Sequence, residues 1–344
     1  MMEKKIVLIT GASSGIGEGC ARKFAMNGYR LILNGRNVEK LNAVKKELLE
    51  KYGADVYLLP FDVRDRQAAH AALESLPEEW KAVDILVNNA GLVIGVDKEH
   101  EGNLDEWDIV IDTNVKALLA MTRLVVPGMV ERGRGHVINM GSIAGDYAYP
   151  GGSVYCACKA AVKALSDGLR IDLVDTPIRV TNIKPGLVET NFSVVRFRGN
   201  REAADNVYKG IRPLTGDDIA EVVYFAAAVP EHIQIAEVLV MPANQATGTI
   251  VSRKQNLYKD MINFLFGVLL LTGSLLAQNV CVSTPKTSLV LSAPEGGTLR
   301  HLYYGNRLSE ADLQNISAAE ANHAAYPEYG LNAPVETALA VKHA

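Results

Sequence analysis

A tyrosine and a lysine, Tyr155 and Lys159, lie four residues apart, so a helix would place both on one face. A free phenol, with a pKa near ~10, holds its proton too tightly to act efficiently at neutral pH. A nearby ammonium favours the phenolate and lowers that pKa. Tyr155 could then give a proton to a carbonyl oxygen as a hydride arrives, or take one in the reverse direction. Because this spacing is also common on helix surfaces, the pair gains weight only from further motifs.

Two such motifs precede the pair. Ser142 follows the apolar run Val137–Met140 and is placed to hydrogen-bond the same oxygen and stabilise its developing charge. Thr10–Gly17 reads TGASSGIG and stands between an apolar run and a helix-length segment. Glycines there let the backbone turn tightly and approach a pyrophosphate, whose charge lies at the helix N-terminus. This loop predicts dinucleotide binding through Gly11, Ser13, Ser14, Gly15, Ile16 and Gly17.

The choice of dinucleotide depends on the residues after the second apolar run. An Asp or Glu in this position binds the ribose hydroxyls of NAD, whereas an arginine accommodates the 2′-phosphate of NADP. The segment Leu33–Asn37 has no carboxylate and contains Arg36. Arg36 could also be an ordinary solvated charge, but both features together predict NADP.

Short β-branched runs that are apolar on both faces alternate with amphipathic stretches from Lys4 to about Asn244. The runs predict strands at Ile6–Ile9, Leu31–Leu33, Val56–Leu59, Ile85–Val87, His136–Met140, Val180–Ile183 and Val238–Val240. The longer stretches predict helices such as Val38–Lys51, Asn114–Arg132 and Ser153–Val174. This alternation predicts an α/β fold with a doubly wound parallel sheet.

The character of the chain changes beyond Gln255. Met261–Ala277 is uncharged and apolar all round, too short for the ~20 residues of a spanning helix, and similar to the apolar region of a signal peptide. The residues from Ser283 to Ala344 are polar and rich in turn formers. We therefore expect a domain over 1–255, a linker with an apolar helix over 256–282, and an incomplete β-rich tail over 283–344.

Composition narrows the possible partners. The 344 residues carry a formal net charge of −4, which gives no electrostatic reason to propose nucleic acid. The four cysteines and seven histidines show no zinc-ligand or disulfide spacing, so no metal is expected. The first five residues contain no apolar run, and with so few cysteines we expect a cytoplasmic protein with reduced thiols.

Residues 1–255 resemble the short-chain dehydrogenases/reductases. The likeness rests on TGASSGIG, NNAG (Asn88–Gly91), the Asn114 of DTNV, the Ser142 of MGSIAG, YCACK (Tyr155–Lys159) and Pro185–Gly186, in that order. The resemblance implies a Rossmann-type single catalytic domain and a tetrad of Asn114, Ser142, Tyr155 and Lys159. Asn114 would hold a water in a proton relay through Lys159, which would also grip the nicotinamide ribose. It further implies coenzyme contacts at Asp62, Val63, Asn89, Ala90, Gly91, Pro185, Gly186, Val188 and Thr190.

Longer segments such as TRLVVPGMVERGRGHVINMGS (122–142) and LTGDDIAEVV (214–223) resemble the NADP-dependent 3-hydroxy acid dehydrogenase branch. This branch includes serine and allo-threonine 3-dehydrogenases and malonic semialdehyde reductases, and it implies a homotetramer. A carboxylated substrate needs a cation, preferably a bidentate arginine. Among the arginines after Pro185–Gly186, we expect Arg196 to bind the substrate carboxylate, beside Ser142 and Tyr155 at the carbonyl. The alternatives are a carbonyl reductase for uncharged ketones or aldehydes and a non-catalytic NADPH-binding sensor.

The tail resembles a different family. Met261–Ala277 followed by LVLSAPEGGTLRHLYYGNRLSEADL (289–313) is similar to the start of a secreted alpha-galactosidase. One interpretation is that two reading frames have been joined and the second is truncated. The other is that the apolar segment tethers the enzyme to a membrane. We favour the joined frames, because a partial β-domain cannot close its sheet.

Overall fold

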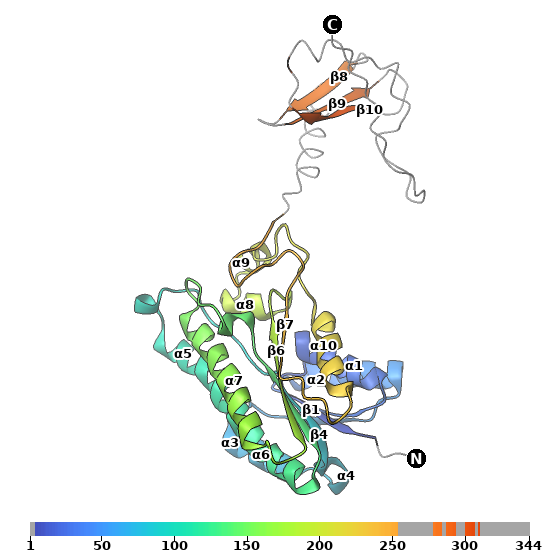
Figure 1. Ribbon diagram of the computed structural model, residues 1–344, viewed down its shortest axis with the longest axis vertical. Coiled ribbons are helices and arrows are strands. Elements are labelled where there is room, and N and C mark those ends of the chain that lie inside the picture. Colours follow the sequence, from blue (N-terminus) through green and yellow to red (C-terminus); the bar gives the residue numbers. More distant parts are fainter. Residues whose placement is uncertain (1–3, 254–277, 284–286, 294–299, 307–308, 310–344) are drawn as a thin grey trace. The chain divides into compact units, whose positions relative to one another are not determined.

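The computed structural model describes residues 4–253, 278–283, 287–293, 300–306 and 309. The chain divides into two compact units, residues 1–255 and 256–344. The first contains a seven-stranded sheet with its helices, and the second a three-stranded sheet (Figure 1).

The sheet of the first unit is parallel throughout, in the order β3-β2-β1-β4-β5-β6-β7. Its strands are β1 (Ile6–Ile9), β2 (Arg30–Gly35), β3 (Val56–Pro60), β4 (Val83–Asn88), β5 (Gly135–Met140), β6 (Ile178–Pro185) and β7 (Glu237–Val240). The chain builds outward from β1 to β3, then crosses to β4 on the other side of β1. The predicted Rossmann-type sheet is therefore confirmed, and its strand order reverses between β1 and β4.

Helices cover both faces of this sheet (Figure 1). On one face, α1 (Gly15–Met26), α2 (Val38–Tyr52) and α10 (Gly216–Ala228) enclose a core with Ile9 and Leu33. On the other, α3 (Arg66–Glu74) and α6 (Ala117–Arg132) enclose a second core with Leu8 and Ile32, and α7 (Ser153–Asp172) also packs on β6. Because side chains alternate along a strand, the unbroken apolar runs supply both layers at once.

Shorter helical elements complete the unit. They are α4 (Glu78–Lys81), α5 (Leu104–Ile111), α8 (Phe192–Arg196), α9 (Arg201–Asn206), the 3₁₀ turns η1 (Glu99–Glu101) and η3 (Ile143–Gly145), and the π-helical turn η2 (Asp112–Lys116). The predicted helix Asn114–Arg132 differs from the one observed, because the helical structure starts earlier and includes this π-helical turn. Helical structure runs from Leu104 to Arg132, and Asn114 lies within a π-helical turn inside it. Such turns are frequent at functional sites, and the apolar period of the sequence does not reveal them.

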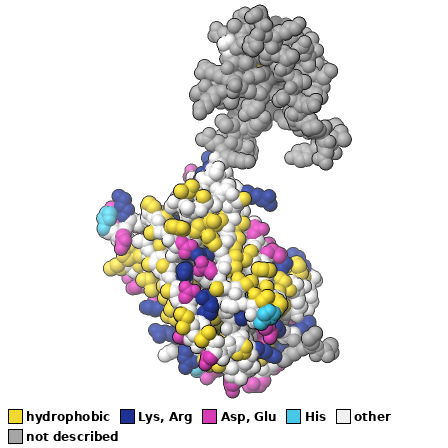
Figure 2. All heavy atoms as spheres, in the orientation of Figure 1, with side chains coloured by type: hydrophobic (Ala, Val, Ile, Leu, Met, Phe, Trp, Pro, Cys, Tyr) yellow, Lys and Arg dark blue, Asp and Glu magenta, His cyan; other side chains and the backbone are white. Residues whose placement is uncertain are grey.

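On the face shown in Figure 2, basic and acidic side chains of the described residues are interspersed. Several charged side chains of this unit pair with a neighbour on another element, such as Arg22 with Asp217 and Lys23 with Glu221. These pairs join α1 to α10, where Gly19 lies so close that a Cβ would be 2.6 Å from the Gly216 oxygen.

The second unit has an antiparallel sheet in the order β10-β9-β8, formed by β8 (Gln278–Ser283), β9 (Thr287–Ala293) and β10 (Arg300–Asn306). The apolar segment 261–277 lies outside the described residues. Among those described, no helix is long and apolar enough to cross a membrane. The origin of the tail stays a prediction.

Candidate functional site

A cleft of about 400 Å³ opens at the carboxyl ends of β1, β4, β5 and β6, next to the point where the strand order reverses. It brings together nearly all the residues predicted for coenzyme and catalysis. Its lining includes Gly11, Ser13, Ser14, Gly15, Ile16, Arg36, Asp62, Val63, Asn89, Ala90, Gly91, Ser142, Tyr155, Lys159, Pro185, Gly186, Val188 and Thr190. Three predicted residues, Gly17, Asn114 and Arg196, are not part of that lining.

The glycine loop is held tightly from behind. The buried Thr10 hydroxyl accepts hydrogen bonds from the backbone N–H groups of Asn89 and Ala90, both at 3.0 Å. The Asn89 side chain donates to the carbonyls of Thr10 and Gly11 at 2.9 and 3.2 Å. A Cβ on Gly17 would lie 2.3 Å from the Gly11 oxygen. Gly17 therefore permits helix α1 to approach the loop and does not line the cleft itself.

The loop leaves the start of α1 open to an anion. Gly11 and Gly15 have φ values of +65° and +59°, a region that favours glycine. Ser14 is the N-cap of α1 but its side chain makes no capping hydrogen bond. The first-turn N–H groups, with the positive end of the helix dipole, thus face the part of the cleft lined by Ser13 to Ile16.

The far end of the cleft holds two arginines around one carboxylate. Arg64 donates from Nε and Nη2 to Asp62, with a shortest distance of 2.6 Å, and this hydrogen bonding holds the pKa of Asp62 below its usual range. The Arg36 side chain is 63% exposed, with Nη1 3.8 Å from Asp62. Arg64 and Lys40 also line the cleft but were not predicted from the sequence. For Arg64, the available sequence signal was its position two residues after Asp62.

Tyr155, Lys159 and Ser142 meet at the middle of the cleft. Tyr155 and Lys159 are buried on α7, with the lysine Nζ 5.6 Å from the centre of the tyrosine ring and 2.8 Å from the Met140 carbonyl. Ser142 is the N-cap of η3, and its hydroxyl accepts a hydrogen bond from the backbone N–H of Ala144 at 3.1 Å. This turn follows β5 directly, so β5 and α7 together position the three side chains.

The electrostatics of the pair differ from the sequence-based expectation. Burial raises the pKa of Tyr155, the nearby Tyr149 adds to the increase, and a hydrogen bond with Ser142 and the charge of Arg196 oppose it. Burial also lowers the pKa of Lys159 to about 8. The pKa of Tyr155 is therefore raised in the protein alone, and not lowered as expected, because desolvation outweighs the opposing effects of Ser142 and Arg196.

Asn114 lies behind the cleft. Its side-chain amide donates to the carbonyls of Leu92 and Val110, at 2.6 and 2.9 Å, while its buried Oδ1 has no hydrogen-bond partner. A Cβ on Gly91 would lie 2.8 Å from this oxygen and 3.5 Å from Lys159 Nζ. Gly91 thus lets the main chain run close to both groups, because a side chain there would crowd the Asn114 oxygen.

The side of the cleft next to Tyr155, where the sequence predicts the substrate, is formed by the segments around α8 and the loop after β4. The guanidinium carbon of Arg196 is 5.0 Å from the centre of the Tyr149 ring, and its buried Nε has no hydrogen-bond partner. Arg198, in contrast, is bound by Asp97 and Glu106. The Phe192 ring is 5.5 Å from that of Tyr155. Arg196 therefore lies near Tyr155 with an unsatisfied donor, whereas Arg198 fastens α8 to the neighbouring loop.

Two further expectations concern metals and thiols. Among the described residues no group of histidine, cysteine, aspartate or glutamate side chains could hold a metal ion. Cys20, Cys156 and Cys158 are buried free thiols, and burial raises the pKa of each.

Comparison with known proteins gives a consistent result. The family model described as short chain dehydrogenase matches residues 5–200. An NADP-dependent 3-hydroxy acid dehydrogenase of Salmonella typhi is 48% identical over 242 residues, covering 70% of this chain and 96% of that protein. One of Schizosaccharomyces pombe is 46% identical over 255 residues, covering 74% and 98%. A solved closed form of serine dehydrogenase complexed with NADP+ has a TM-score of 0.68 at 45% identity, covering 73% of this chain and all of that one.

Proposed function

We propose that this chain, which belongs to the short-chain dehydrogenase family, is an NADP-dependent oxidoreductase that interconverts a 3-hydroxy acid and the matching 3-oxo acid. One observation carries the proposal. A buried tyrosine and lysine and a half-buried serine line the same cleft as the glycine loop and two arginines. The half-buried Arg196, whose Nε has no hydrogen-bond partner, lies against Tyr149, and its charge acts on Tyr155. The likeness to 3-hydroxy acid and serine dehydrogenases supports the substrate class.

The residues of the cleft fit NADP. The uncapped start of α1 and the close-packed glycines suit the pyrophosphate, and Arg36 and Arg64 suit the 2′-phosphate. Asp62 and Val63 would flank the adenine, while Asn89 to Gly91, Pro185, Gly186, Val188 and Thr190 would line the remainder. When bound, the nicotinamide supplies or accepts the hydride, and its oxidised form adds a positive charge near Tyr155.

In the proposed mechanism Tyr155 is the general acid and base. In the reductive direction its hydroxyl gives a proton to the carbonyl oxygen, while the Ser142 hydroxyl donates a hydrogen bond to that oxygen. Tyr155 is then restored by a proton that arrives from Lys159. The unpartnered Oδ1 of Asn114, close to Lys159 across Gly91, is suited to hold a water that resupplies the lysine.

Arg196 is the proposed partner of the substrate carboxylate. An arginine Nε that is buried without an acceptor carries a desolvation cost, which a carboxylate would relieve through charge-assisted hydrogen bonds. Tyr149 beneath its guanidinium keeps the side chain near Tyr155. Arg196 thus gives the substrate site a positive charge at a defined distance from the carbonyl.

The test is a substrate panel followed with the NADPH absorbance band. We expect turnover of malonic semialdehyde, L-serine or allo-threonine, and a loss of about 2 kcal/mol in transition-state binding for Arg196→Ala on those acids only. Arg201→Ala, on the exposed start of α9, is the matched control. Equal losses on an acid and on an uncharged secondary alcohol would overturn the carboxylate role. Turnover of uncharged carbonyls alone would indicate a general carbonyl reductase, and binding without turnover an NADPH sensor.

We further propose a cytoplasmic homotetramer. The free buried thiols support a reducing compartment. Exposed apolar side chains on α10 and around β7, including Phe225 at 60% and Leu239 at 43% exposure, support association of several copies. Sedimentation of the purified chain checks the assembly, and a monomer at micromolar concentration would contradict it.

A further inference from the structure

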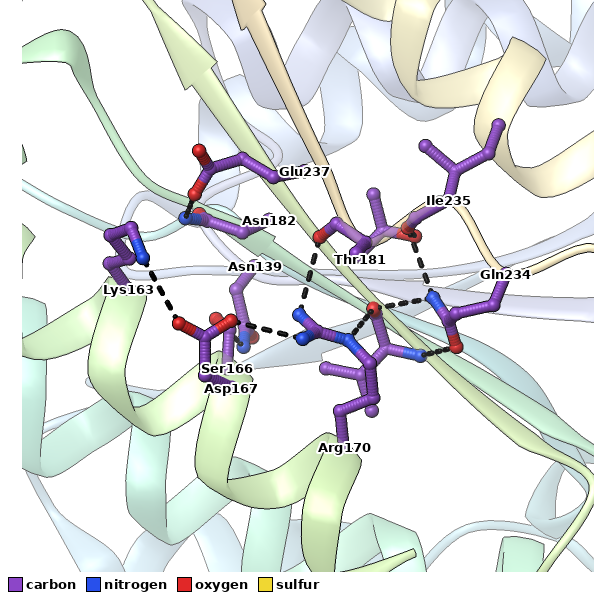
Figure 3. Close-up of polar contacts among 12 residues, drawn as sticks. Asn139, Lys163, Ser166, Asp167, Arg170, Thr181, Asn182, Gln234, Ile235 and Glu237 are labelled. Atoms are coloured by element: carbon purple, nitrogen blue, oxygen red, sulfur yellow. Dashed lines mark hydrogen bonds and ion pairs between the residues drawn. The ribbon is translucent and has the colours of Figure 1, made fainter. Parts of the chain in front are cut away.

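A buried lysine lies between two carboxylates behind the catalytic serine. Lys184 is on β6 and is 5% exposed. Its Nζ is 2.6 Å from Asp146 Oδ2 and 2.8 Å from Glu237 Oε1. The other carboxylate oxygen of Glu237 accepts a hydrogen bond from Asn182 at 3.2 Å (Figure 3). These two ion pairs raise the pKa of Lys184 above its ordinary value although burial opposes them, so the lysine is charged.

The two carboxylates belong to different parts of the catalytic framework. Asp146 ends the η3 turn, whose first residue is preceded by Ser142. Glu237 begins β7, the last strand of the sheet. Lys184 therefore connects the turn that carries the serine to the edge strand of the sheet, and it does so through side chains alone.

The rest of the serine turn is closely packed, so a shift at Asp146 would be transmitted. At one end the Gly141 N–H donates to the Ile183 carbonyl at 2.7 Å. In the middle Gly145 lies against α7, where a Cβ would be 2.7 Å from the Lys159 carbonyl oxygen. At the other end the Asp146 carboxylate pairs with Lys184. Lys184 thus holds the far end of a turn that begins at Ser142 and packs against the backbone of Lys159.

The pairing of β6 within the sheet does not depend on this lysine, because β6 is paired with β5 over six residue pairs and with β7 over four. A buried ion pair as a whole contributes little net stability, because the cost of removing the charges from water offsets their attraction, whereas removal of one partner alone is costly. What such a cluster does provide is a defined geometry, and catalysis is sensitive to misplacement on the scale of an ångström.

We infer that Lys184 is a positioning residue for the proposed reaction, which sets Ser142 and the Lys159 turn of α7 by holding Asp146 against Glu237. This inference rests on the proposed function. It assigns no contact with substrate or coenzyme to Lys184, because the residue is not among those that line the cleft.

The test compares Lys184→Met, Lys184→Arg and Asp146→Asn with the wild type. The matched control is Lys163→Met, which removes a half-exposed lysine paired with Asp167 on the same helix as Tyr155. Five quantities are measured: kcat and KM with malonic semialdehyde, the isotope effect with NADPH deuterated at the transferred position, NADPH affinity by fluorescence, and the thermal midpoint.

We expect kcat to fall about tenfold to a hundredfold in Lys184→Met and Asp146→Asn, with a larger isotope effect and NADPH affinity within about twofold of the wild type. Lys184→Arg should recover part of kcat, and Lys163→Met should change nothing. If Lys184→Met fails to fold, Asp146→Asn decides, since it leaves the Lys184–Glu237 pair in place. A folded Asp146→Asn with unchanged kcat and isotope effect would overturn the inference, as would a loss that follows NADPH affinity or stability.

Failure of the proposed function can be distinguished from failure of the inference about Lys184. If the wild type reduces an uncharged aldehyde but no 3-oxo acid, only the substrate class is wrong. The same variants are then compared on the aldehyde, because Ser142 acts at the carbonyl and not at the carboxylate. A wild type inactive on both substrates overturns both proposals.

Discussion

The two halves of the cleft are built in different ways. The coenzyme half depends on the main chain: on glycines that allow close approach, and on the uncapped start of α1. The half next to Tyr155, where the substrate is proposed to bind, depends on side chains from loops and short helices, such as Arg196 of α8 over Tyr149 and Arg198 between Asp97 and Glu106 of α5. A main-chain site tolerates few residue types at each position and so leaves a short, recognisable motif. A side-chain site can be made in many ways and leaves a weaker trace in the sequence.

The variant with the largest expected effect should lose catalytic activity and still bind the coenzyme. Tyr155→Phe removes the proposed proton donor and should lower kcat about a thousandfold, within the range of general acid–base catalysis. NADPH affinity, measured by fluorescence titration, should change less than about threefold. Tyr147→Phe, at a tyrosine whose side chain is 56% exposed, is the control. A Tyr155→Phe enzyme with near-normal kcat would assign the proton to another group.

The second prediction tests the main-chain character of the coenzyme half. In Gly17→Ala the new methyl would lie 2.3 Å from the Gly11 oxygen and 2.5 Å from Asn89 Nδ2. We expect a cost of about 2 kcal/mol, divided between a lower thermal midpoint and weaker NADPH binding. Gly168→Ala on α7, where a Cβ meets nothing within 4 Å, should be neutral or stabilising. Unchanged stability and affinity in Gly17→Ala would show that α1 can move away from the loop at no cost.

The third prediction concerns the two arginines at the far end of the cleft. They offer side-chain contacts to the coenzyme, whereas the rest of the coenzyme half offers mainly main-chain contacts. Arg36→Gln and Arg64→Gln should each weaken NADPH binding about tenfold, as expected for a lost charge-assisted hydrogen bond. NADH affinity should stay unchanged, because only the 2′-phosphate distinguishes the two coenzymes. Arg66→Gln, at an exposed arginine on α3, serves as the control. If Arg64→Gln weakens both coenzymes equally, its role is to hold Asp62 at the adenine.

The smallest effect is a pH dependence from Lys159. Its pKa is lowered to about 8, so above that pH the folded protein loses the charge, and reductive kcat/KM should fall about tenfold per pH unit. Stability should change in the opposite direction. An unfolded lysine keeps its proton to a pKa of about 10.4, so between these values the unfolded state binds more protons and stability rises with pH.

Measuring kcat/KM and the thermal midpoint from pH 7 to 10 therefore separates titration from denaturation. Lys159→Arg should move the decline in kcat/KM above the measured range, because a guanidinium stays charged. A parallel fall of both quantities in the wild type would assign the decline to unfolding.

Much of the fold and of the coenzyme site could be predicted from the sequence. Apolar runs such as Ile6–Ile9 gave the strands, since residues buried on both faces must be apolar at every position. Two features could not be predicted. The π-helical turn at Asn114 does not change the apolar period. The Lys184 cluster joins residues that are far apart in the sequence and meet only where strands β6 and β7 and the η3 turn come together.

The sequence by itself determined the strands, the glycine loop, the tyrosine–lysine pair and the Arg36 signal for NADP, because each depends on residues close together in the chain. Only the tertiary structure decided the electrostatic state of that pair. Burial raises the pKa of Tyr155 and lowers that of Lys159, since desolvation depends on the packing of β5, α7 and α8 and not on a four-residue spacing. Packing likewise gave Arg196 its unpartnered Nε, and it brought Lys184 behind Ser142.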